Sequence, residues 1–268
     1  MKKILLIAVM IIASTFVFAA CTDNAQTPSA ERRTLVMGTS AGFFPFEFIA
    51  NSGEGVIGQY AGIDVSLAAR IAEELDMEIV IQDQDFGGLL MALQNRQIDF
   101  VAAAMTIRPD RAEMVNFSVP YFDAWQLVLV AAGNDTINSV SDLEGMIVGV
   151  QLGTTAELAL TDPDVNINFQ NINSYDHPAP GVLALISGSI DAFVIDAPTA
   201  RAFLAEYPDD LRTFEDSEFF GAEQYGMAFH LEDTELLGMF NGVLERLIEE
   251  GYVDYLYNWY NSEFSPSE

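Results

Sequence analysis

The sequence predicts an α/β fold of two lobes, each a mainly parallel sheet flanked by helices, with two strands forming a hinge between them. The first sign is the β-α-β-α-β order of segments through Ala104, which implies a parallel sheet with right-handed crossovers. The second is a similar alternation that begins near residues 141–145 without repeating the earlier sequence. The third is a pair of short segments, near 120–125 and 220–225, where the chain would cross to the second lobe and return.

Composition and charge limit the partners of this chain. Its 268 residues, 50% of them hydrophobic, suffice for one large or two modest domains. The formal net charge of −29 argues against a nucleic acid as partner. The acidic surface would either concentrate cationic ligands or keep the protein soluble in salty surroundings. The single cysteine, Cys21, excludes an internal disulfide. His177 and His230 are far apart and lack cysteine neighbours, which argues against a zinc site, and no cofactor is predicted.

The N-terminus has the pattern of an exported protein. Residues 1–20 show a basic start, a short apolar stretch and then small residues, as in a secretory signal. The segment F-A-A-C at 18–21 resembles the lipobox of bacterial lipoproteins. That resemblance implies cleavage before Cys21, a lipid on its thiol and attachment to the cell membrane, in the periplasm or on the outer face. The alternative is an ordinary cleavage site with an incidental cysteine. Residues 21–33 would form a flexible tether.

The first lobe is predicted over residues 34–122. Its clearest element is an amphipathic helix, because Ile63, Leu67, Ile71 and Leu75 recur every four residues. The other expected elements are strands at 34–39, 78–82 and 98–104, a hairpin turn at 51–58 and a helix around 89–93. Ligands of such sheets bind beyond the carboxyl ends of the strands, so the segments that follow these strands are the candidates for a site.

A strand tip followed by an arginine suggests where a carboxylate would bind. The apolar strand ends at Met105 and Thr106, and a helix begins over 108–111 with a proline in its first turn. Exposed backbone amides, the Thr106 hydroxyl and the planar guanidinium of Arg111 would together hold both oxygens of a carboxylate. The alternative is a plain strand-to-helix turn with a surface arginine.

The second lobe is predicted over residues 123–224, after which the chain returns to the first lobe over 225–262 and ends in a tail at 263–268. The expected elements of the second lobe are strands at 125–131, 146–150, 165–169 and 192–195 and helices at 155–160, 180–187 and 198–206. The return segment would add a strand at 226–231 and helices at 236–249 and 253–260.

Two strand ends of the second lobe carry polar groups. The loop 151–154 leads into a helix that begins at Thr155. It lacks the Lys-Ser/Thr of a P-loop, but the unpaired amides and the dipole of a helix start favour a carboxylate there. Asp196 ends a strand directly before the helix that begins at Pro198. It is suited to cap that helix, and this role would not exclude another.

Short motifs spread over residues 34–261 resemble the bacterial extracellular solute-binding proteins of family 3. The segment A-M-T-I-R-P-D-R at 104–111 is similar to the family's G-M-T-I-T-x-E-R. The other motifs, in the family's order, are F-P-F-E-F at 44–48, G-I-D-V at 62–65, D-F-G-G-L at 85–89, L-Q-N-R-Q-I-D at 93–99, V-G-V-Q-L-G-T-T at 148–155, V-I-D-A-P at 194–198 and Q-Y-G at 224–226. The resemblance implies the type II periplasmic-binding-protein fold. It also implies a monomer that captures a free amino acid for the permease and ATPase subunits of an ABC importer.

The resemblance also assigns the site. Arg111 and Thr106 would bind the ligand carboxylate, Asp196 would accept from its α-ammonium, and Thr154 would contribute from the second lobe. The ligand-binding residues implied in this way are Ser40, Phe43, Phe86, Ala104, Met105, Thr106, Arg111, Gln151, Thr154, Thr155, Asp196 and Tyr225. Several members place an acid at the Ser40 position, so Ser40 favours a neutral or small polar ligand over arginine.

Two other functions fit the same fold. Cyclohexadienyl dehydratases share it, and they would need a carboxyl group placed to protonate a leaving hydroxyl. Glu47 and Glu223 are the acids near the expected cleft, and their sequence surroundings give no sign of a raised pKa. No Ser–His–Asp or Cys–His set is expected, because Cys21 lies at the terminus and His177 in a proline-flanked loop. The other alternative is a chemosensory ligand-binding module. The prediction is therefore a binding protein and not an enzyme.

Overall fold

A computed structural model describes residues 32–51 and 53–264, which belong to one compact unit. The predicted signal at 1–20, Cys21 and nearly all of the predicted tether lie outside the described residues. Among the described residues, none of the helices combines the length and the apolar composition needed to cross a bilayer.

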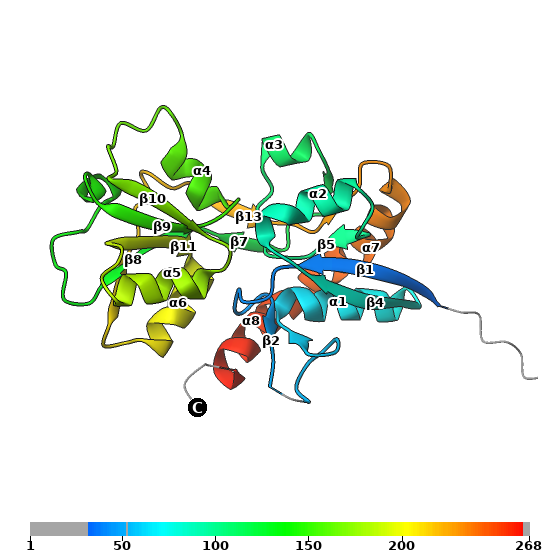
Figure 1. The fold of residues 1–268 in the computed structure, drawn as a ribbon. Helices are drawn as coiled ribbons and strands as arrows, with labels where there is room; N and C mark the ends of the chain where they lie inside the picture. The colour runs from blue at the N-terminus through cyan, green and yellow to red at the C-terminus, as the bar shows by residue number, and fades with distance from the viewer. Residues whose placement is uncertain (1–31, 52, 265–268) are drawn as a thin grey trace, which may run out of the picture. The chain divides into compact units, whose positions relative to one another are not determined.

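The first sheet, with its helices, forms the first lobe (Figure 1). Its strands lie in the order β4 (Met77–Asp83), β1 (Arg33–Thr39), β5 (Phe100–Val101), β14 (Ala228–Phe229) and β6 (Asn116–Phe117). Its helices are α1 (Ile63–Glu74), α2 (Leu89–Gln94), α3 (Pro109–Ala112), α7 (Thr234–Glu249) and α8 (Tyr252–Glu263), and a 3-10 turn, η1, covers Phe86–Gly88. A two-stranded hairpin of β2 (Phe48–Ile49) and β3 (Tyr60–Ala61) precedes α1. The apolar face of α1 is buried, and α1 packs against β4, α7 and α8.

The second sheet, with its helices, forms the second lobe. Its strands lie in the order β10 (Asn171–Tyr175), β9 (Ile147–Gln151), β11 (Ala192–Asp196), β8 (Gln126–Ala131) and β12 (Leu211–Phe214). The helices are α4 (Thr155–Thr161), α5 (Pro178–Ile186) and α6 (Ala197–Glu206), with a 3-10 turn, η2, at Val140–Leu143. Every residue of β11 is buried, as expected for a central strand covered on both faces.

The chain passes from one sheet to the other through two short strands that pair with each other. β7 (Phe122–Ala124) leads from the first sheet toward β8, and β13 (Glu223–Tyr225) leads back from β12 toward β14. They are antiparallel, with Gln224 opposite Asp123 (Figure 1). This pair corresponds to the hinge that the sequence predicts near 120–125 and 220–225.

The predicted α/β architecture is confirmed, and each sheet contains one strand, β14 or β8, that runs opposite to the other four. In each lobe one half of the sheet is paired in parallel, β4-β1-β5 and β10-β9-β11, and the other half is antiparallel. The two reversed strands, β8 and β14, each directly follow a crossing between the lobes. A strand that enters from the other lobe runs against its neighbours because no helical crossover has turned the chain around.

Three predicted strands differ from the structure. Residues 165–169 form no strand: Ile167 and Phe169 pack on the core of the second lobe, while the more polar β10 pairs with β9. The alternation of apolar residues at 165–169 therefore reflects packing of these side chains on the core, and the segment pairs with no strand. The strands expected at 98–104 and 226–231 shorten to β5 and β14. After β5 the backbone leaves the sheet, because the amide of Ala104 donates to the Asp64 carboxylate instead of to a neighbouring strand.

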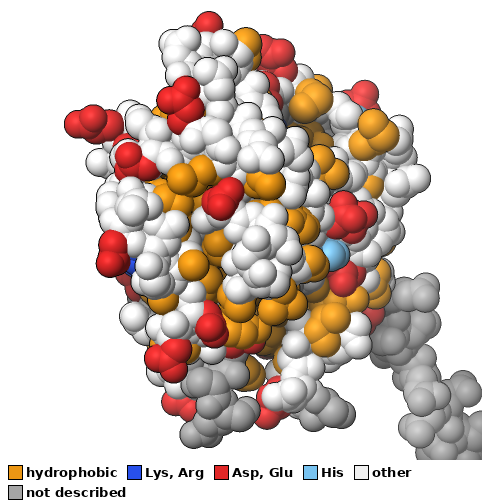
Figure 2. All heavy atoms as spheres, turned by 60° about the vertical axis from the view of Figure 1, so that its left-hand side comes forward, with side chains coloured by type: hydrophobic (Ala, Val, Ile, Leu, Met, Phe, Trp, Pro, Cys, Tyr) orange, Lys and Arg blue, Asp and Glu red, His pale blue; other side chains and the backbone are white. Residues whose placement is uncertain are grey.

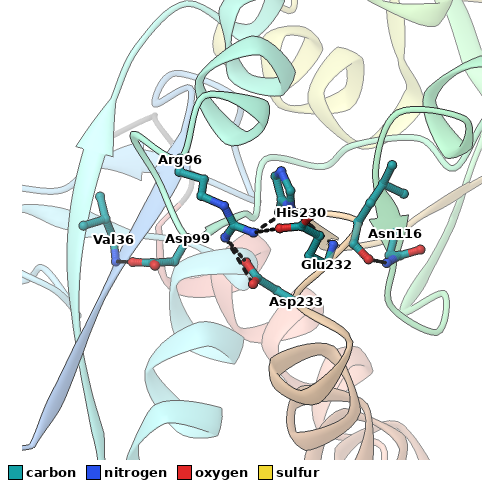
Figure 3. Close-up of polar contacts among 8 residues, drawn as sticks. Val36, Arg96, Asp99, Asn116, His230, Glu232 and Asp233 are labelled. Atoms are coloured by element: carbon teal, nitrogen blue, oxygen red, sulfur yellow. Dashed lines mark hydrogen bonds and ion pairs between the residues drawn. The ribbon is translucent and has the colours of Figure 1, made fainter.

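A polar cluster attaches the returning segment to the first lobe (Figure 3). Arg96, at the turn after α2, binds Glu232 and Asp233 at 2.7 and 3.0 Å and contacts the Nδ1 atom of His230 at 3.0 Å. Asn116 donates to the carbonyl of Leu231 at 2.9 Å. The loop between β14 and α7 is thus bound to residues far earlier in the chain.

Candidate functional site

A small cavity lies between the two lobes, and its empty space of about 320 Å³ includes the solvent at its mouth. Most of the predicted ligand-binding residues line it. Those that do are Ser40, Phe43, Phe86, Ala104, Thr106, Gln151, Thr154, Thr155 and Asp196. Two residues absent from that prediction, Glu47 and Ala103, also line it.

The ends of the strands place these side chains. β1 ends directly before Ser40, β9 ends at Gln151 and β11 ends at Asp196. Each belongs to a parallel pairing, and the carboxyl ends of such strands form the crevice where α/β proteins bind ligands.

Arg111 lies beside the cavity and connects the lobes. Its side chain is buried, and it donates to the carbonyl of Thr106 and, across the cleft, to the carbonyl of Gly153, both at 2.9 Å. The guanidinium carbon lies 5.4 Å from the centre of the Phe86 ring. Burial lowers the pKa of Arg111 to about 10, which leaves it charged at neutral pH. A guanidinium has five N–H donors, so these two bonds do not exhaust its capacity to bind a carboxylate.

The loop before α4 is less open to an anion than the sequence predicts. The Thr154 hydroxyl donates to the carbonyl of Gln151 at 2.7 Å and accepts from the amide of Glu157 at 3.4 Å, so it caps α4. The amide of Gly153 donates to the Glu157 carboxylate at 2.6 Å. The chain's own acid therefore occupies part of the positive end of this helix.

Asp196 faces the cavity and does not cap α6. Its carboxylate accepts short hydrogen bonds from Gln126 and from the hydroxyl of Tyr225, and it makes no side-chain cap bond. Burial and the nearby charge of Glu223 raise its pKa to about 7, although Tyr225, Gln126 and Arg111 oppose the rise. Tyr225 does not line the cavity; it orients Asp196 from behind.

Glu223 joins threonines of the two lobes. Its carboxylate accepts from the Thr106 hydroxyl at 2.8 Å and from the Thr155 hydroxyl at 3.1 Å, and these two hydroxyls lie 3.2 Å apart. Because Glu223 lies in β13, a strand of the hinge connects directly to both walls of the cleft.

Met105 was predicted to line the site, but it is packed in the core beneath it. The side chain is 1% exposed and belongs to an apolar cluster with Leu89, Val101 and Val115. Ala103 takes the place at the cavity wall. The irregular backbone after β5, where Ala104 has a φ of 46°, breaks the alternation of sides on which the prediction depended.

Glu47 is the functional candidate that the sequence analysis underrated. It lines the cavity, it is 1% exposed, and its Oε2 atom has no hydrogen-bond partner. Burial, together with Asp64, Asp196 and Asp83, raises its pKa well above the usual range. The prediction that nothing raises this pKa is wrong for Glu47. No local pattern signals this burial, because it depends on packing of the loop against α1.

The surface of the molecule is acidic on the face shown in Figure 2. Figure 2 shows Asp and Glu side chains spread over one face of the molecule, with hardly any Lys or Arg. Despite this, the described part of the chain contains no group of three or more His, Cys, Asp and Glu residues arranged to hold a metal. His177, at the start of α5, lies 3.6 Å from Asp85 and outside the cavity lining.

Comparisons with known proteins agree on one family. The model of the bacterial extracellular solute-binding proteins, family 3, matches residues 35–263. The "Probable histidine-binding protein" of Campylobacter jejuni is 32% identical and covers 98% of this chain and 100% of its own length. The "Arginine-binding extracellular protein" of Bacillus subtilis has the same identity and the same two coverages.

Solved structures give the same result. A mutant of ArgBP from T. maritima is 38% identical, with a TM-score of 0.77 over 86% of this chain and 96% of its own. An ancestral amino-acid-binding protein, described as a precursor of cyclohexadienyl dehydratase, is 34% identical, with a TM-score of 0.73 over 84% and 94%. These likenesses confirm the predicted two-lobed fold.

Proposed function

Because the chain belongs to the bacterial extracellular solute-binding proteins of family 3, we propose that it captures a free amino acid outside the cytoplasm and delivers it to the permease of an ABC importer. The two curated relatives are named for histidine and for arginine, so an amino acid is the common class. We propose the cavity between the lobes as the binding site.

The observation that carries this proposal is the placement of opposite charges on opposite lobes. Arg111 belongs to α3 of the first lobe, and Asp196 ends β11 of the second. An α-amino acid carries a carboxylate and an ammonium on one carbon, so it complements both groups only when the lobes are close together. A ligand that makes more contacts in the closed form shifts the protein toward that form.

Titration calorimetry against the twenty amino acids, with ornithine, citrulline and cystine, tests the proposal. Arg111→Ala should weaken binding of the best ligand at least a hundredfold, because the ligand carboxylate loses its charged partner. Arg111→Lys should also weaken binding substantially, because one ammonium does not reproduce the planar fork of the guanidinium. Loss of a buried charge partner costs about 3–5 kcal/mol, and about 1.4 kcal/mol corresponds to a factor of ten. Asp196→Asn should weaken the same ligand.

The matched control is Arg108→Lys. Arg108 pairs with Asp110 at 2.7 Å and does not line the cavity, so its replacement should leave the affinity within threefold. Absence of binding by every amino acid, or equal effects of Arg111→Lys and Arg108→Lys, contradicts this function or this site.

We also propose that Cys21, which lies outside the described residues, carries the lipid that attaches the protein to the membrane. The support is the basic start, the short apolar stretch and the F-A-A-C segment. A diacylglyceryl group supplies two chains, which suffices for stable anchoring where one chain is marginal. Mass spectrometry of the native N-terminus should find an acylated Cys21, and an unmodified, secreted protein would contradict it.

A dehydratase is the second candidate, because Glu47 supplies the buried acid that such an enzyme needs. Its raised pKa would keep a proton available for a leaving hydroxyl at the cavity wall. The likeness to an ancestor of cyclohexadienyl dehydratase adds to this. Turnover of prephenate or arogenate by the purified protein, and its loss in Glu47→Gln, would establish a dehydratase. Absence of turnover would contradict this second candidate.

A further inference from the structure

The charges around the cavity do not balance for an ordinary zwitterion. Asp196 and Arg111 complement the ammonium and the carboxylate of the α-carbon. Glu47 remains as a further acid in the cavity wall, and no Lys or Arg lines this cavity. Glu223, bound to the threonines of both lobes, adds another negative charge close by. A ligand with one additional positive charge would restore the balance.

Two buried oxygen atoms in the cavity wall have no hydrogen-bond partner. The Oε2 atom of Glu47 and the hydroxyl of Ser40 both lack a hydrogen bond, and both residues line the cavity. They are 1% and 2% exposed. Buried polar atoms are nearly always paired, so two such atoms at one cavity point to a ligand that supplies donors.

The backbone fixes Glu47 in place. Its carbonyl accepts from the amide of Phe43 at 2.9 Å, and its own amide donates back to Phe43 at 3.2 Å. The carbonyl of Phe46 accepts from the amide of Asp64 at the start of α1. Gly62 has a φ of 122°, and a Cβ there would meet the Phe46 carbonyl oxygen at 2.1 Å. The loop is therefore clamped against α1, and Glu47 is held at the wall rather than free to turn outward.

We propose that Glu47, with the Ser40 hydroxyl of the same cavity wall, receives the cationic end of the ligand's side chain, so that this site selects a basic amino acid. The inference rests on the proposed function, since it assumes that an amino acid occupies the cavity. It replaces the preference for a neutral side chain that Ser40 alone suggests.

Proton release is a consequence of this arrangement. The groups that face Glu47 are Asp64 from α1, Asp83 at the end of β4, Asp196 from β11 and the hydroxyl of Tyr121, and the three acids raise its pKa together with burial. Burial and these acids therefore favour the protonated form of Glu47 in the empty site. A cation favours the ionised carboxylate, so its arrival would expel the proton to the buffer.

The test compares ligands of similar shape that differ in charge. Arginine and lysine are titrated against their neutral counterparts citrulline and norleucine, with wild type, Glu47→Gln and Glu78→Gln. Glu78 is an exposed acid on β4, so its replacement removes the same charge without touching the cavity. Wild type should prefer at least one cation over its counterpart by tenfold or more. Glu47→Gln should reduce that preference at least tenfold, and Glu78→Gln should preserve it.

A second measurement needs no variant. Calorimetry at pH 7 in phosphate and in imidazole, which differ in ionisation enthalpy, counts the protons released. Arginine should release more than citrulline, because release from Asp196 is common to both ligands and only the cation acts on Glu47. Melting temperatures of the empty proteins establish that the variants fold.

The failures of the two proposals are distinguishable. If citrulline or norleucine binds as tightly as its cationic counterpart, or if Glu47→Gln weakens both members of a pair equally, the inference is wrong while the amino-acid receptor stands. If no amino acid binds wild type, the proposed function itself fails.

Discussion

Asp64 illustrates how a single buried carboxyl organises the wall of the cleft. It is fully buried, and it accepts hydrogen bonds from the amide of Ala104 and from the hydroxyl of Tyr121, both at 2.7 Å. The first bond holds Ala104, a cavity residue, at its positive φ of 46°. An alanine in this conformation is strained, so the bond to Asp64 maintains a backbone shape that the sequence alone would not choose.

The pH dependence of stability follows from the same residue. Burial raises the pKa of Asp64 from 3.8 to about 7, and the pKa of Asp196 is raised to the same level. The folded protein therefore holds protons that the unfolded chain has lost between pH 4 and pH 7. Stability from these groups is present below pH 4 and is lost as the pH rises through 7. We expect the melting temperature of the empty protein to fall by at least about 4 °C between pH 5 and pH 8.

Asp64→Asn supplies the control, since it removes one of the two titrations. Its melting curve should depend less steeply on pH than that of wild type over the same range. An unchanged dependence would mean that other groups are responsible, such as general repulsion among the acidic surface residues.

Single residues were only partly predictable. Asp196 was predicted from its place at a strand end, and the structure does bring it to the cavity. Glu47 was not, because its burial depends on the hairpin and on α1, which fold over a loop from elsewhere in the sequence. Arg111 was expected to point at the ligand, but it also reaches Gly153 of the other lobe. No local pattern encodes that contact.

At the scale of the element, α7 contains two glycines that lower its helix stability. Gly238 and Gly242 are exposed within this 16-residue helix, and a Cβ at either position would meet no atom within 4 Å. Glycine in a helix interior costs about 0.5–1 kcal/mol relative to alanine. Gly238→Ala with Gly242→Ala should therefore raise the melting temperature by about 2–8 °C in a chain of this size.

Gly251→Ala is the contrasting variant. Its Cβ would also meet nothing within 4 Å, but Gly251 has a φ of 72° before α8. Alanine there is strained, so this variant should melt at a lower temperature than wild type. If all three substitutions changed the melting temperature in the same direction, backbone conformation would not be the cause.

Elements with strong periodicity were predictable, and short strands were not. The helix at 63–75 appears as α1 within one residue, because its repeating apolar positions all face the sheet. β14 covers only two residues, and β10 is a polar strand, N-I-N-S-Y. Both exist because neighbouring strands offer backbone partners, and this depends on tertiary structure rather than on propensity.

At the scale of the whole molecule, two glycines meet where the lobes approach each other. A Cβ on Gly153 of the second lobe would lie 2.9 Å from the Cα atom of Gly87 in the first. Gly153→Ala should hold the lobes apart at this point and weaken the bond from Arg111 to the Gly153 carbonyl. We expect at least a tenfold loss of affinity for the best amino acid, measured by calorimetry, together with a lower melting temperature of the empty protein, because Gly153 has a φ of 79°.

Two controls separate contact from strain. A Cβ on Gly87 would lie 3.7 Å from Leu152, an ordinary contact, so Gly87→Ala should bind within threefold of wild type. Gly145 has a φ of 75°, and a Cβ there would meet nothing within 4 Å. Gly145→Ala therefore has the same backbone strain as Gly153→Ala but brings no Cβ against the other lobe. If Gly153→Ala binds the ligand as tightly as Gly145→Ala, closure of the two lobes does not depend on the close approach of Gly153 to Gly87.

The place of β14 in the first sheet has a consequence for how the protein is made. β14 lies between β5 and β6, although all other strands of that sheet occur before residue 118, and α7, which packs on it, follows in the chain. The second sheet, by contrast, is complete within residues 126–214. A nascent chain emerging from the ribosome could therefore fold its second lobe first, as a continuous segment. Its first lobe must wait, with the inner edges of β5 and β6 unpaired, until β14 has been synthesised and inserted between them.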